Sequence, residues 1–165
     1  MDEVRAMIDD GLAHHRAGRA EAAERLYRQV LDLDPANAEA CHLIGVLRFQ
    51  EGRPGEAVAA FEQALRADPD NAKMLANLGA ALLVLGRIDP AIAALERAAD
   101  VAPETPELLN NLGSAYRQAN RLDDAVSASR RAVAVFPGES AAHGNLASAL
   151  LASGRQDDAL EAAER

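Results

Sequence analysis

The sequence is poor in aromatic residues and in cysteine. Only 3% of its 165 residues are aromatic, there is no tryptophan, and Cys41 is the single cysteine. One cysteine excludes an internal disulfide, and its place in a helix-packing position predicts a buried, inert thiol. Because bulky aromatic side chains are scarce, we expect a core of closely packed alanine and leucine side chains.

Long apolar runs and excess positive charge are also lacking. No stretch approaches the roughly eighteen apolar residues that a membrane-spanning helix needs, and the first residues have no basic start followed by an apolar run. We therefore expect a cytoplasmic protein without a membrane partner. The 17 Lys and Arg against 26 Asp and Glu give a net charge of -9, which repels phosphate backbones and argues against nucleic acid as a partner.

What the sequence does contain is internal repetition. Three residue types recur at one common spacing of 34 residues, each at its own phase. They are glycine (Gly11, Gly45, Gly79, Gly113), alanine (Ala23, Ala57, Ala91, Ala125, Ala159) and proline (Pro35, Pro69, Pro103, Pro137). Self-similarity at such a period is typical of a helical solenoid, in which each repeat packs against its neighbours.

The period divides the chain into repeats 4–37, 38–71, 72–105, 106–139 and 140–165. Each repeat holds a first helix A, a tight turn and a second helix B. Glycine marks the turn except in the fourth repeat, where Asn120 takes its place and tolerates the same left-handed conformation. The predicted helices of the first four repeats span 3–17, 20–33, 37–51, 55–67, 72–85, 89–101, 106–118 and 122–135.

Small residues at the eighth position of the repeat, alanine at the twentieth and proline at the thirty-second resemble the tetratricopeptide repeat. Departures exist: Asp10 replaces an apolar seventh residue, Ser129 and Ala163 replace a large twenty-fourth one, and no tryptophan occupies the fourth position. The resemblance implies an all-α, right-handed α-solenoid of about five helix-turn-helix repeats that forms a single domain, 1–165. The last repeat stops partway through its B helix, so we expect either a longer protein or an exposed end that pairs with another molecule.

The resemblance also implies that the A helices line a concave groove that binds ligands through fixed positions. The sixth position carries an asparagine in three consecutive repeats: Asn77, Asn111 and Asn145. An asparagine can pair with both the N–H and the C=O of an extended peptide, and such a run resembles the asparagine ladder in the repeat domain of protein O-linked N-acetylglucosamine transferases. The alternative is that these residues are common at this position, exposed and idle.

Apolar residues occupy further groove positions in the second and third repeats: Leu43, Val46, Phe49, Leu83 and Val84. They predict an apolar pocket for a hydrophobic peptide or an amphipathic helix. Burial under neighbouring helices is the other interpretation. Arg117 and Gln118 could add polar specificity.

Catalytic and metal-binding patterns are not evident. His14 and His15 are adjacent and point about 100 degrees apart on a helix, and the Asp pairs after the inter-helix turns are explained by helix capping. We expect no cofactor, no metal and no enzymatic activity. No phosphate-binding glycine loop is present.

The leading hypothesis is a protein-interaction module that binds an extended or helical peptide in its groove. One alternative is the substrate-recruiting part of a larger enzyme, such as a protein glycosyltransferase. Another is a self-assembling scaffold, a homo-oligomer that mates through the open C-terminal helix or the apolar groove. The sequence itself does not name the ligand.

Overall fold

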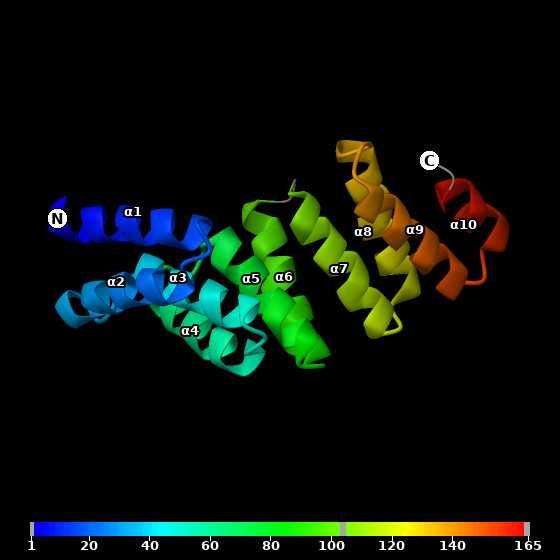
Figure 1. Cartoon of the computed structure of the whole chain (residues 1–165). Helices are drawn as coiled ribbons and strands as arrows, with labels where there is room; N and C mark the ends of the chain where they lie inside the picture. Colours follow the sequence, from blue (N-terminus) through cyan, green and yellow to red (C-terminus); the bar gives the residue numbers. More distant parts are fainter. Residues whose placement is uncertain (1, 103–104, 164–165) are drawn as a thin grey trace.

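The computed structural model describes residues 2–102 and 105–163, which form ten α-helices arranged in a row (Figure 1). Consecutive helices pack as five pairs, in agreement with the predicted all-helical repeat fold. They are α1 (Asp2–Arg16), α2 (Ala20–Leu33), α3 (Ala38–Gln50), α4 (Pro54–Ala67), α5 (Ala72–Val84), α6 (Ile88–Val101), α7 (Pro106–Gln118), α8 (Leu122–Val135), α9 (Ser140–Ala152) and α10 (Gln156–Ala163). The ends of α1 to α8 lie within one residue of the predicted ends.

Local sequence explains where the helices begin and turn. Asn37 and Asn71 cap α3 and α5, because their side-chain oxygens accept hydrogen bonds from Ala40 N (3.0 Å) and Met74 N (3.2 Å). Four of the turns within pairs contain a glycine with positive φ, and the fourth pair uses Asn120 at φ 59°. The predicted left-handed conformation of Asn120 is thus confirmed. Pro103, one of the four periodic prolines, lies outside the described residues.

Within the first four pairs, a glycine on the A helix lets the B helix approach closely. A Cβ atom added to Gly45 would lie 2.5 Å from the ring of Phe61, and one added to Gly79 would lie 2.5 Å from Leu95. Phe61 and Leu95 are both almost completely buried. The periodic glycines are therefore packing positions, where any side chain would collide with the residue at the twenty-fourth position of the same repeat.

The core is a chain of small clusters rather than one central core, as expected of a solenoid. One cluster joins α5, α6, α7 and α8 through residues such as Leu75, Leu95 and Leu108. Another joins the first two pairs around Tyr27 and Leu47. Cys41 is buried beside Ala64 and Met74, and burial raises the pKa of its thiol, which agrees with the predicted inert role.

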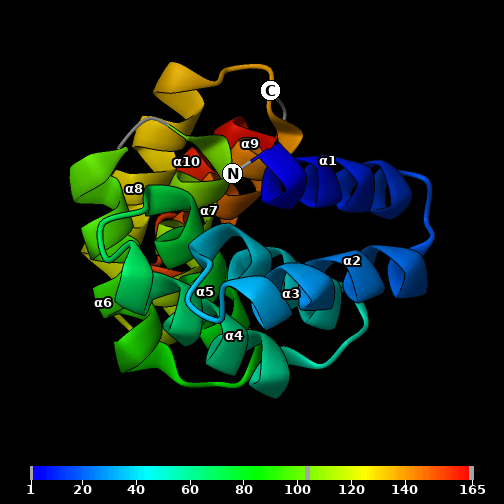
Figure 2. The same ribbon diagram turned by 90° about the vertical axis from the view of Figure 1, so that its left-hand side faces the viewer.

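The A helices α3, α5, α7 and α9 each pack between two B helices, and α5 also packs against α7 and α7 against α9. Seen along the row in Figure 2, α4, α6 and α8 follow the outer side, while α3, α5 and α7 lie nearer the middle. The A helices therefore supply the inner, concave face. Among the described residues, no helix combines the length and the apolar character that crossing a membrane requires.

Candidate functional site

The C-terminal ends of α3, α5 and α7 enclose an open hollow of about 450 Å³ on the concave face. We call it the apolar hollow. It is lined by Phe49, Ala80, Leu83, Val84, Asn111, Ser114 and Gln118. Val84 is 64% exposed, whereas Phe49 and Leu83 are half-buried and pack against the core around Phe61 and Leu82. Five of the ten predicted groove residues thus lie around one surface depression, contributed by three successive repeats.

Two of the predicted apolar residues lie elsewhere. Leu43 is buried in the core between the first two pairs, beside Tyr27 and Leu47. Val46 is half-buried and packs against the cluster that contains Phe61 and Ala81. Neither residue lines the apolar hollow, because both side chains pack against core residues of neighbouring helices.

The three asparagines of the sixth position are not equivalent. Asn77 Nδ2 donates to Nε2 of His42 at 2.8 Å, and Asn145 Nδ2 donates to Oδ1 of Asn110 at 3.1 Å. Each bond joins two successive A helices. Asn111 has no side-chain hydrogen bond within the described part of the chain, because the residue at the corresponding place on α5 is Ala76. Its amide is therefore the one that is free to bind a ligand.

His42 shows why Asn77 is held in place. Its side chain is buried, and its ring lies against that of Phe61 with the ring centres 5.6 Å apart. Burial, with a smaller effect of the Lys73 charge, lowers the His42 pKa to about 4. The imidazole is consequently neutral at physiological pH, and its Nε2 can accept the hydrogen bond from Asn77.

The polar residues at the C-terminal edge of the apolar hollow come from α7. Gln118 Nε2 donates to Ser114 Oγ at 3.3 Å, so these two side chains form one polar wall. Arg117 is the next residue but does not line the hollow. It is exposed, and it makes no ion pair among the residues that the structure describes.

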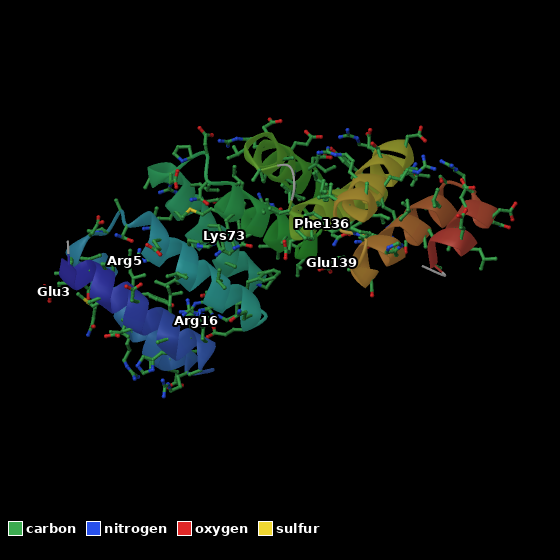
Figure 3. The ribbon with its side chains drawn as sticks, turned by 90° about the horizontal axis from the view of Figure 1, so that it is seen from above. Glu3, Arg5, Arg16, Lys73, Phe136 and Glu139 are labelled. Carbon is green, nitrogen blue, oxygen red and sulfur yellow. The ribbon has the colours of Figure 1, made fainter. Side chains whose placement is uncertain are left out.

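A second hollow lies near the other end of the A helices. It has a volume of about 560 Å³ and is lined by Ala72, Lys73, Ala76, Asn77, Ala102, Thr105, Glu107 and Leu108. Figure 3 shows Lys73 near the start of α5, on the side that faces the viewer. The sequence pattern did not predict this hollow, because loop residues after α6 complete it.

The described residues contain no group of three or more His, Cys, Asp or Glu side chains that could hold a metal ion. Three of the four histidines make separate contacts. His15 Nε2 is bonded to Gln50 Oε1 at 2.7 Å, His143 Nε2 lies 2.9 Å from the Pro137 carbonyl oxygen, and His42 contacts Asn77.

Comparison with known proteins agrees with this geometry. Tetratricopeptide repeat models match residues 5–37, 48–115 and 110–165. The solved structure of MamA AMB-1 has 26% identity and a TM-score of 0.84, covering 96% of this chain and 94% of its own. No curated protein matches the sequence.

Two further solved structures share the fold at 23% identity. MamA 41-end from Desulfovibrio magneticus RS-1 has a TM-score of 0.88, covering 98% of this chain and 92% of its own. PilF from Pseudomonas aeruginosa has a TM-score of 0.85, covering 99% of this chain and 76% of its own. These similarities are to MamA and PilF and not to an O-linked N-acetylglucosamine transferase, the relative suggested by the asparagine run. The repeat models, the helix pairs and the concave face together place this chain in the tetratricopeptide repeat family.

Proposed function

We propose that the chain is a protein-interaction module that binds a short segment of a partner protein in the apolar hollow. Tetratricopeptide repeats stack into extended concave surfaces that serve for binding, and an interaction role needs no catalytic group. The observation that carries the proposal is the combination of one exposed and two half-buried apolar side chains with one unpaired amide in the same depression. Such a mixture suits a peptide that has both apolar side chains and backbone polar groups.

In this proposal the partner segment inserts an apolar side chain between Phe49, Leu83 and Val84. Asn111 then pairs with the segment's backbone, because its amide can donate and accept at once. Asn77 and Asn145 hold neighbouring A helices in register instead of contacting the ligand. The sequence predicted three equivalent asparagine contacts to the ligand. In this proposal only Asn111 contacts the ligand, and the other two asparagines join neighbouring helices.

The expected affinity is modest. Full burial of one Leu or Val side chain contributes about 1.5–3 kcal/mol, and each new hydrogen bond about 0.5–1.5 kcal/mol net. Two apolar contacts and two bonds at Asn111 therefore give about 4–9 kcal/mol before the cost of association. A micromolar complex needs about 8 kcal/mol, so we expect micromolar or weaker binding to a single segment.

The test is a selection of peptides about twelve residues long from a random display library on the wild-type chain, followed by affinity measurements on variants. Val84→Asp places a charge in the apolar hollow, while Val135→Asp changes another exposed valine that also ends its helix. Selected peptides should bind the wild type and Val135→Asp and lose at least about tenfold on Val84→Asp. Equal binding to both variants, or no enrichment at all, would refute the proposal.

Self-association is a second candidate, supported by a different observation. Val58, Ile92 and Val126 occupy the twenty-first position of their repeats and are 5–6% exposed, because they lie in the cores that join each pair to the next. Leu160 holds the same position on α10 and is 65% exposed. Light scattering over a range of concentrations tests this candidate: oligomers that Leu160→Asp abolishes would support it, and a monomer throughout would exclude it.

A further inference from the structure

We propose that the partner segment bound at the concave face is acidic, with Asp or Glu residues on either side of its apolar anchor. This inference rests on the proposed function and specifies the chemistry of the partner. It comes from the distribution of charge along the concave face, which differs sharply from that of the whole chain.

The concave face has two strips of A-helix positions. The first strip comprises the second, fifth and sixth positions of the repeats, near the start of each A helix. It carries both signs of charge, and Arg5 is paired there with Asp9 at 3.3 Å and with Glu39 at 3.6 Å. Positive and negative groups largely neutralise one another in this strip.

The second strip comprises the ninth, twelfth and thirteenth positions, near the end of each A helix. Its residues are Leu12, His15, Arg16, Val46, Phe49, Gln50, Ala80, Leu83, Val84, Ser114, Arg117, Gln118, Ser148, Leu151 and Ala152. The strip contains two arginines and no carboxylate, in a chain whose net charge is -9. The apolar hollow lies in the middle of this strip.

The two arginines are at opposite sides of the apolar hollow. Arg16 ends α1 (Figure 3), and the bond from His15 to Gln50 ties this end of α1 to the end of α3. Arg117 is in the last turn of α7, next to Gln118 of the hollow. Both side chains are exposed, and neither forms an ion pair in the ranges 2–102 and 105–163. The unpaired cations therefore bracket an apolar centre.

The nearest acidic group in sequence to the second strip is already occupied. Glu51 follows α3 directly, and its Oε2 is 2.9 Å from Arg48 and 3.1 Å from Arg53. More distant carboxylates are weakened by screening, since the Debye length is about 8 Å at physiological salt. A ligand in the second strip thus meets two unpaired guanidinium groups and no carboxylate within the strip, despite the negative net charge.

The span between the arginines fixes the length of the segment. From α1 to α7 there are three helix-to-helix steps of about 8–10 Å each, or about 24–30 Å. An extended chain covers this distance with about seven to nine residues at roughly 3.3 Å per residue. Guanidinium groups pair well with carboxylates, so acidic residues at the ends of such a segment and an apolar residue near its centre match the strip.

The test uses the peptides selected from the random display library. We expect Asp and Glu to be enriched over the input library on both sides of an apolar residue. Combining Arg16→Glu with Arg117→Glu should weaken these peptides by about three- to tenfold, because each exposed ion pair contributes little, and selection on that double variant should favour Lys and Arg instead. Arg25→Glu is the control, since Arg25 is exposed on α2 and lies outside the strip.

The outcomes separate the two proposals. Peptides that depend on Val84 but show no acidic enrichment, or that bind the double arginine variant as well as the wild type, would overturn the acidic partner and leave the binding site standing. Peptides that do not depend on Val84 would overturn the binding site and this inference with it.

Discussion

Replacing Ser129 by alanine is expected to stabilise the protein, which is the opposite of what most substitutions of buried residues do. Ser129 on α8 is 1% exposed, and its hydroxyl has no hydrogen-bond partner among the described residues. It occupies the position that holds Tyr27, Phe61 and Leu95 in the first three repeats. A buried hydroxyl without a partner costs about 1–3 kcal/mol.

The magnitude follows from two contributions. Removing the unpaired hydroxyl should recover about 1 kcal/mol or more, and alanine gains up to about 0.5 kcal/mol over serine from helix propensity. Ser127→Ala separates the two effects, because Ser127 is exposed on the same helix and changes propensity alone. We therefore expect Ser129→Ala to exceed Ser127→Ala by about 1 kcal/mol, or roughly 2–4 °C in Tm for a chain of this size.

The assay is guanidinium denaturation followed by far-ultraviolet circular dichroism on the wild type and both variants under identical conditions. Repeat arrays need not unfold in a single step, so the midpoints of the transitions are compared. A Ser129→Ala variant no more stable than Ser127→Ala would refute the reasoning, because it would mean that the hydroxyl has found a partner in solution.

The remaining predictions concern pH and a buried ion pair. The His42 pKa is about 4 in the folded chain, below its ordinary value of about 6.5. The unfolded chain therefore binds the proton first as the pH falls. The free energy of unfolding should decrease by about 3 kcal/mol in total between about pH 6.5 and pH 4. His42→Gln should lack this part of the loss in urea titrations at pH 7, 5 and 4; parallel losses in both proteins would contradict it. Arg48, whose side chain is 8% exposed, pairs with Glu24 and Glu51. Arg48→Met should destabilise by about 1–3 kcal/mol, because the half-buried Glu24 then keeps only the exposed Arg28 as a partner. Most of that loss should return when Glu24→Gln is added, and an equal cost for the single and double variants would count against the explanation.

The helix pairs could be predicted from the sequence because most repeats carry similar turn, capping and packing residues at the same positions. Glycine or Asn120 at the turn, and asparagine caps such as Asn71, set the ends of the helices independently of tertiary contacts. Gly45 and Phe61 likewise specify close packing within one pair. Each of these features acts within about one repeat, and the 34-residue period presents it several times.

The candidate site depends on contacts between successive repeats, and these were harder to predict. The bonds from Asn77 to His42 and from Asn145 to Asn110 each join residues 35 apart. The sixth position of one A helix therefore faces the fifth position of the preceding A helix, 35 residues earlier in the chain. Comparing each sixth-position asparagine with the fifth position of the preceding repeat would have identified Asn111, opposite Ala76, as the free amide.

The burial of Leu43 is a different case. Its place in the repeat is a groove position, but its surroundings come from the first pair, where Tyr27 and Leu47 contribute to the same cluster. Position within a repeat does not by itself determine burial, because the neighbouring repeats place different side chains around the same position.

The most direct test of the proposed binding site is nuclear magnetic resonance of the isotope-labelled chain during titration with a selected peptide. We expect the side-chain amide signals of Asn111 and Gln118 to move, together with the methyl signals of Leu83 and Val84, while the Asn145 amide signal keeps its position. Changes confined to the outer B helices or to α10, with Asn111 unaffected, would contradict the claim that the apolar hollow is the binding site.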